Sequence, residues 1–180
     1  MKKSLMLLVS AITIAALAPA TVQGAQTTGT FLLVMEAPNF GVAPNGDEIE
    51  VTGGGEFTAS PKSVTASGDF THHVAGGEAL SGTWTATELI SFSFYGCRLI
   101  PALGVDLGDD DLCGGALKMR VMLDTPLGQA PGIMTVFCII GEQAPSSHNT
   151  PPGEGVTLSV PGIINFNHTT HGMNVFIRTS

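Results

Sequence analysis

Apolar and polar residues alternate along most of the chain after residue 25, with the period of two that is typical of strands with one buried face. The longest such segment covers residues 80–95, where Trp84 and Phe92 fall on one face and Thr83 and Thr85 on the other. Because this length exceeds an ordinary strand, the pattern predicts a bend or bulge near Glu88.

Three hairpins are predicted from neighbouring alternating segments. The first pairs residues 64–74 with 80–95, the second pairs 117–123 with 133–140, and the third pairs 163–168 with 173–178 through a four-residue loop. In the third hairpin this register places Phe166 opposite Val175 and Ile164 opposite Ile177. Shorter strands are predicted at residues 30–36, 48–52 and 156–160.

About nine short strands separated by glycine- and proline-containing turns favour an all-β fold. The chain has 23 glycines and 11 prolines, scattered between the apolar segments. This pattern predicts an antiparallel β-sandwich, and a closed β-barrel is the alternative, because alternation along single strands does not report closure of a sheet.

The only helical pattern lies in residues 1–24, which have the form of a secretory signal peptide. Lys2 and Lys3 precede an apolar run over residues 5–17 that is shorter than the roughly 20 residues needed to span a bilayer. Small residues follow, so cleavage is predicted after Gly24, with Ala20 as the alternative. Residues 25–180 then form a single secreted domain, extracellular, periplasmic or in the cell envelope, without a membrane span.

The acidic composition excludes several classes of partner. The full chain has a net charge of −8, and removal of Lys2 and Lys3 with the signal peptide changes it to −10. A surface with this much negative charge repels phosphate backbones and anionic lipids. The composition therefore argues against binding to nucleic acid or to membranes that contain anionic lipids.

Three cysteines permit one internal disulfide in an exported protein. Cys138 lies in the apolar segment 133–140, where a buried free thiol is common. The pattern therefore favours a Cys97–Cys113 disulfide, with Cys97–Cys138 as the alternative.

Histidines near two predicted hairpin tips form the first candidate site. His168 and His171 flank the last turn, and His72 lies near the end of an earlier strand. If these tips share one end of the fold, the three imidazoles could bind Zn²⁺ or Cu²⁺. The adjacent His73 would point to the opposite face of its strand.

A run of aspartates between Cys97 and Cys113 forms the second candidate site, for Ca²⁺. It consists of Asp106, Asp109, Asp110 and Asp111, whose carboxylates are the ligands that Ca²⁺ prefers. Its spacing does not match an EF-hand loop, and a solvated acidic loop is the alternative.

Glu88 is the third candidate, because an unpaired carboxylate on an apolar face would be costly and could serve as a general acid. A bulge that turns Glu88 outward, or a pairing with Arg98 or Arg120, explains the residue without a catalytic role.

The sequence has no nucleotide-binding, nucleophile-elbow or zinc-protease motif. It therefore favours a secreted, non-enzymatic binding or interaction module whose partner is an extracellular protein or a glycan. The alternative is a small extracellular metalloprotein or enzyme that uses the histidines.

Overall fold

The computed structural model describes residues 27–77, 79–148 and 153–180. The predicted signal peptide lies outside the described residues. In the described part of the chain, no helix is long and apolar enough to cross a membrane.

Antiparallel strands make up most of the described chain, and one short 3-10 turn, η1, covers Ser146–His148. The strands are β1 (Thr30–Val42), β2 (Glu48–Thr58), β3 (Ser63–His73), β4 (Ala79–Cys97), β5 (Leu99–Ile100), β6 (Val105–Asp106), β7 (Leu112–Thr125), β8 (Gly128–Cys138), β9 (Gly155–Val160), β10 (Ile164–Phe166) and β11 (His168–Arg178). The prediction of an all-β, antiparallel fold is therefore confirmed.

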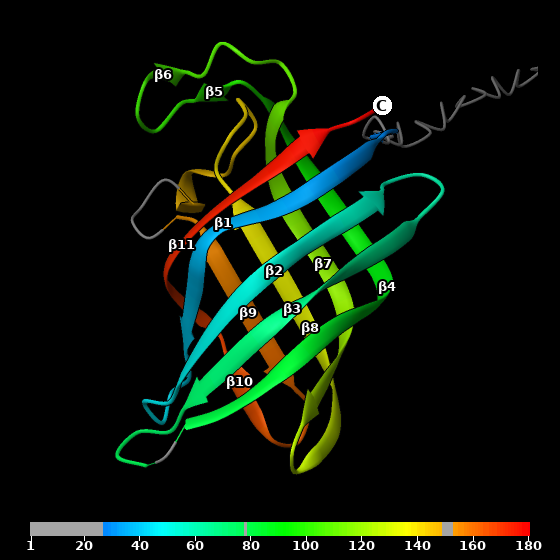
Figure 1. Cartoon of the computed structure of the whole chain (residues 1–180). Coiled ribbons are helices and arrows are strands. Elements are labelled where there is room, and N and C mark those ends of the chain that lie inside the picture. Colours follow the sequence, from blue (N-terminus) through cyan, green and yellow to red (C-terminus); the bar gives the residue numbers. More distant parts are fainter. Residues whose placement is uncertain (1–26, 78, 149–152) are drawn as a thin grey trace, which may run out of the picture.

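Nine strands form one strongly curved sheet in the order β10-β9-β8-β7-β11-β1-β2-β3-β4, and β4 also pairs with β7 (Figure 1). The pairings thus run from β7 through β11, β1, β2, β3 and β4 and return to β7. The β1–β2, β3–β4 and β7–β8 turns and the β9–β10 connection all lie at one end of the sheet, at the bottom of Figure 1. We call this end the turn end.

The core is built from the inward faces that the alternation predicts. Trp84 is completely buried, and its indole N–H donates a hydrogen bond to the carbonyl of Thr52 at 2.9 Å. Gly53 lies under the indole with φ at +140°, and a Cβ there would lie 2.8 Å from the ring. This position therefore requires glycine, both for its backbone conformation and for the space that Trp84 takes.

The predicted irregularity in the longest strand is confirmed. The register between β4 and β7 shifts between Ala86 and Glu88, and again between Leu89 and Ser91. Since each extra residue reverses the alternation, Leu89 is buried although simple alternation places it on the polar face. The placement of Leu89 on the polar face is therefore wrong, whereas Trp84 and Phe92 both pack in the core as predicted.

The first two predicted hairpins are confirmed, as β3–β4 and β7–β8. The third is wrong. β10 pairs with β9, whereas β11 begins at His168 and pairs with β1 and β7. The residues assigned to a loop instead continue the strand, with Thr169 opposite Gly41 and His171 opposite Phe40. Pairing with a strand more than 100 residues away thus replaces the local turn.

Candidate functional site

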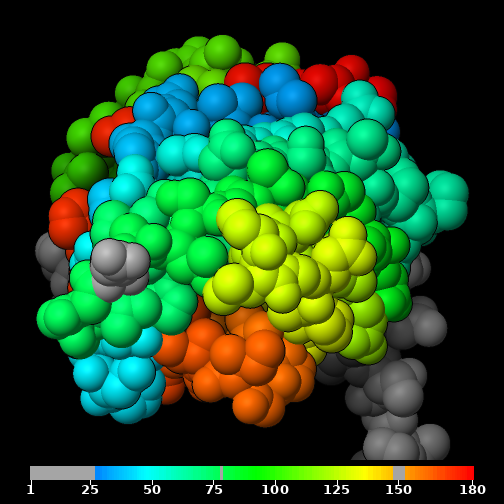
Figure 2. Space-filling model, turned by 60° about the horizontal axis from the view of Figure 1, so that its bottom comes forward, coloured from blue at the N-terminus to red at the C-terminus, as the bar shows by residue number. Residues whose placement is uncertain are grey.

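A pocket of about 280 Å³ opens at the turn end of the sheet. Its walls are mainly apolar side chains from β2, β3, β4, β7, β8, β9 and β10. The lining residues are Ile49, Phe70, His72, Leu80, Leu123, Thr125, Leu127, Gly128, Gln129, Ala130, Leu158, Val160, Ile163, Ile164 and Phe166. In Figure 2, which brings this end forward, the yellow β7–β8 turn lies beside the orange β9–β10 connection and the green β3–β4 segment.

Two strongly exposed apolar side chains belong to the pocket. Leu127, in the β7–β8 turn, is 84% exposed, and Ile163, in the β9–β10 connection, is 72% exposed. Single exposed apolar residues are ordinary, but two that flank an apolar pocket form a continuous surface. This arrangement is typical of the entrance to a site for an apolar ligand.

His72 is the one ionisable side chain in the lining, and it is paired with Asp47. The Nε2 of His72 lies 2.8 Å from Oδ2 of Asp47, in the β1–β2 turn. The second carboxylate oxygen accepts a hydrogen bond from the backbone N–H of Ala75 at 3.0 Å. On its other side, the imidazole meets the ring of Phe166 edge-on, with centroids 5.2 Å apart.

Asp47 is charged in this arrangement. The N–H of Ala75 and then the ring of His72 hold the pKa of Asp47 below its ordinary value of 3.8. The hydrogen bonds to the Asp47 carboxylate therefore stabilise the fold above pH 3.8, and this contribution is lost as the pH falls through the lowered pKa of Asp47. A charged carboxylate only accepts hydrogen bonds, so Nε2 of His72 must carry the donated proton.

The structure separates the three histidines of the predicted Zn²⁺ or Cu²⁺ site. His72 lies on β3 opposite Ile49 of β2, whereas His168 and His171 lie on β11 opposite Val42 and Phe40 of β1. Since β1 and β2 intervene, three strand spacings of about 4.8 Å place β3 roughly 14 Å from β11. His168 and His171 lie within β11 and not at a hairpin tip, and the intervening strands keep them apart from His72.

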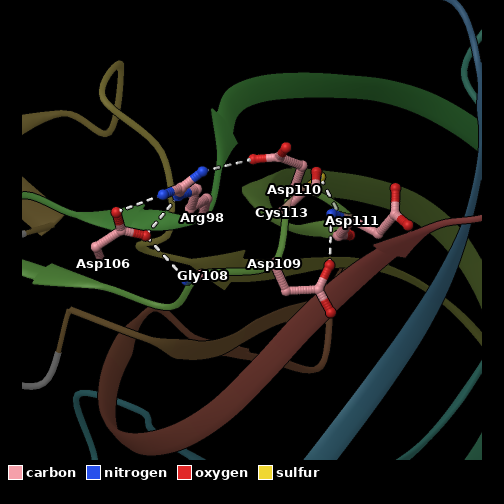
Figure 3. A network of polar contacts seen from close by, with 7 residues as sticks. All are labelled: Arg98, Asp106, Gly108, Asp109, Asp110, Asp111 and Cys113. Carbon is pink, nitrogen blue, oxygen red and sulfur yellow. Dashed lines mark hydrogen bonds and ion pairs between the residues drawn. The ribbon is translucent and has the colours of Figure 1, made fainter.

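The four aspartates of the predicted Ca²⁺ site point in different directions (Figure 3). Arg98 pairs with Asp106, with Nη2 2.9 Å from Oδ2, and lies 3.4 Å from Asp110. This pairing raises the pKa of Arg98 and lowers that of Asp106. The side chain of Asp109 accepts the N–H of Asp111 at 2.9 Å, which closes a local turn.

Within the described residues, no group of three or more His, Cys, Asp or Glu side chains is arranged to hold a metal ion. This covers the aspartate loop and the three histidines alike. Both metal sites stay predictions that the arrangement of the side chains does not support.

The remaining sequence candidates have structural partners. Cys97 and Cys113 form the predicted disulfide, and Cys138 is the buried free thiol. Glu88 points outward after the bulge and pairs with Arg120, whose Nε lies 2.7 Å from the carboxylate. The structural explanation of Glu88 is therefore confirmed.

A buried polar cluster at the junction of β1, β8, β9 and β11 contains two further ionisable groups with shifted pKa values. Burial raises the pKa of the Glu154 carboxyl, and burial together with nearby Glu154 raises that of Cys138. The carboxylate accepts the N–H groups of Ile139 and Asn174, at 3.1 and 3.3 Å. In the described chain, every buried side-chain nitrogen or oxygen has a partner, so this cluster has the character of a structural junction.

The raised pKa of Glu154 gives a pH-dependent prediction for Glu154→Gln, which cannot titrate. Protonation of Glu154 stabilises the fold, fully below its ordinary pKa of 4.5, and this contribution declines as the pH rises through the raised pKa. The free energy of unfolding of the wild type relative to the variant should therefore grow as the pH falls from 7 to 5. Urea denaturation at several pH values measures this difference.

The matched control for that series is Glu56→Gln, since Glu56 is exposed on β2. The control should show no such trend. A wild-type advantage over Glu154→Gln that stays constant from pH 7 to 5 would contradict the assignment.

Comparisons with protein-family models, with curated proteins and with solved structures find no match for this chain. The function must therefore be inferred from the geometry of the chain itself.

His72 is identifiable as a candidate from the sequence, whereas its partner Asp47 is not. Asp47 follows Asn45 and Gly46 in a turn, and Asn45 accepts the backbone N–H of Asp47 at 3.2 Å. The Asn-Gly-Asp run signals the turn, yet only the β2–β3 pairing shows that this turn lies beside His72. The pocket itself carries no sequence signal, because its lining comes from seven strands.

Proposed function

We propose that this chain is a secreted, non-enzymatic binding protein that holds one small apolar molecule in the pocket at the turn end. The observation that carries the proposal is the exposed pair Leu127 and Ile163 at the entrance of an apolar pocket. Exposure of two large apolar side chains is unfavourable unless a bound molecule covers them. A volume of about 280 Å³ suits a molecule with up to three aromatic rings or a short acyl chain.

We infer that the curved sheet encloses this pocket as a barrel, the alternative that the alternation left open. The return of the strand pairings to β7 supports this interpretation, since a sandwich needs two separate sheets. The disulfide between Cys97 and Cys113 supports export to an oxidising compartment, and the apolar run of residues 5–17 supports the signal peptide.

The test uses N-phenyl-1-naphthylamine, an uncharged dye whose fluorescence rises in an apolar site. The wild-type protein should bind one dye molecule at saturation. Ala130 lies in the pocket wall, so the larger side chain of Ala130→Phe should fill part of the volume and weaken binding about tenfold or more. Fluorescence titration measures the affinity, and circular dichroism checks that the variant is folded.

A second pair of variants tests the entrance at positions that tolerate change. Leu127→Asp places a charge at the pocket mouth and should weaken dye binding several-fold, since the substitution removes apolar contact and adds a group that must stay hydrated. Leu103→Asp is the matched control, because Leu103 is 69% exposed in the β5–β6 loop at the opposite end. Equal affinities for the wild type, Ala130→Phe and Leu127→Asp would overturn the proposal.

A further inference from the structure

The imidazole of His72 offers the pocket one nitrogen that the protein does not use. Nε2 is committed to Asp47, and the described residues provide no hydrogen-bond partner for Nδ1. Every buried side-chain nitrogen or oxygen in this part of the chain has a partner. An unpartnered Nδ1 on a half-buried residue must therefore be reachable from outside the protein, and His72 lines the pocket.

The protonation state of Nδ1 follows from that of Asp47. Because Nε2 donates its proton to the charged carboxylate, Nδ1 of a neutral His72 carries a lone pair and accepts hydrogen bonds. Among the described residues, Asp47 is the charged group that contacts the ring. The other elements packed against His72 present Ile49 from β2, Leu80 from β4 and Phe166 from β10.

On the basis of the proposed function, we propose that the ligand is an uncharged apolar molecule with one hydroxyl group, an alcohol or a phenol, that donates its hydrogen bond to Nδ1 of His72. The hydroxyl donates the hydrogen bond that Nδ1 can accept. The apolar remainder of the ligand packs against Leu80 and Phe166 in the pocket wall. A permanently anionic head group suits the site less well, since Asp47 and the net charge of −8 oppose it.

Three naphthalenes with the same ring system test the inference. They are 1-naphthol, which donates, 1-methoxynaphthalene, which only accepts, and naphthalene-1-sulfonate, which is anionic at every pH used. At pH 8 the wild-type protein should bind 1-naphthol about fivefold more tightly than the ether, the value of one ordinary hydrogen bond. The sulfonate should bind more weakly than 1-naphthol, since Asp47 and the acidic surface oppose an anion.

The matched variants are His72→Phe and His73→Phe. His73 is the next residue on β3, and it pairs with Glu50 on the outer face, 3.4 Å away. His72→Phe keeps a ring beside Phe166, and it should bind 1-naphthol and the ether equally, whereas His73→Phe should behave as the wild type. The comparison of 1-naphthol with the ether on the wild type needs no variant, so it stands even if His72→Phe does not fold.

The outcomes separate the two proposals. Binding of 1-methoxynaphthalene without any preference for 1-naphthol at pH 8 would overturn the role of His72 and leave the apolar pocket intact. A preference that persists in His72→Phe would also overturn that role. A failure of all three compounds to bind would overturn the proposed function together with this inference.

Discussion

Replacement of Asn174 by alanine should lower the free energy of unfolding by about 3–4 kcal/mol, because several buried polar groups would each lose a hydrogen bond at once. Asn174 on β11 is 2% exposed, and Asn39 on β1 is completely buried. Nδ2 of Asn174 donates to Oδ1 of Asn39 at 2.8 Å, and Nδ2 of Asn39 donates to Oδ1 of Asn174 at 3.0 Å.

The same amide joins two further strands. Nδ2 of Asn174 also lies 3.0 Å from the carbonyl of Phe137 on β8 and 3.4 Å from that of Gly155 on β9. Alanine would leave both carbonyls and the amide of Asn39 without this partner in a region that water does not reach. An unpaired buried polar group costs about 1–3 kcal/mol, so the sum exceeds the cost of a typical surface substitution.

Urea denaturation measures the loss, and Asn165→Ala provides the control. Asn165 is exposed on β10, so the same chemical change there should alter the free energy of unfolding by less than about 0.5 kcal/mol. The double variant Asn39→Ala/Asn174→Ala should lose clearly less than the sum of the single variants, since the two amides satisfy each other. Additive losses, or a loss at Asn174 as small as at Asn165, would contradict the buried pair.

The strands that the sequence predicted correctly depend on local information. Alternation places Trp84 in the core, and the glycines after residue 75 allow β4 to return beside β3. The bulge at Glu88 was also predictable, because a segment of that length with a carboxylate on its apolar face conflicts with a straight strand. Each of these inferences uses residues that are close together in the sequence.

The errors arise where distant segments compete with local turns. The expected loop at residues 169–172 was plausible because Ile163–Phe166 and Val175–Ile177 can oppose each other, yet β11 gains a long pairing with β1 instead. Asn39 and Asn174 are 135 residues apart, and only that pairing brings them together. An asparagine two positions before the buried Phe176 was the one local sign of a polar group on a core face.

The candidate site shows the same limit. His72 was identifiable because histidine is chemically versatile, but its role depends on Asp47 and on a wall built from seven strands. The predicted partners His168 and His171 fail for a geometric reason, since a shared end of a sheet does not fix how many strands separate two side chains. The length of the apolar runs likewise predicts burial, whereas an open pocket depends on how the strands close around it.

Loss of the disulfide is the second large effect that we expect. The double variant Cys97→Ser/Cys113→Ser should lose about 3 kcal/mol of unfolding free energy, because the bond closes a loop with a sequence separation of 16 and so restricts the unfolded chain. A typical domain has a free energy of unfolding of roughly 5–15 kcal/mol, so this loss is a large fraction of the total. Urea denaturation of the variant, and of the wild type with and without dithiothreitol, measures the loss.

Cys138→Ala is the matched control, since this cysteine is buried but unbonded. It should cost less than the double variant, and its stability should still fall on addition of dithiothreitol, whereas that of the double variant should not. The disulfide joins β4 to β7 at the end of the sheet opposite the pocket, so the folded double variant should retain its affinity for N-phenyl-1-naphthylamine. A double variant as stable as the wild type would contradict a stabilising role. Lost dye binding in a still-folded double variant would instead mean that the bond also controls the shape of the pocket, through the β4–β7 pairing that links the two ends.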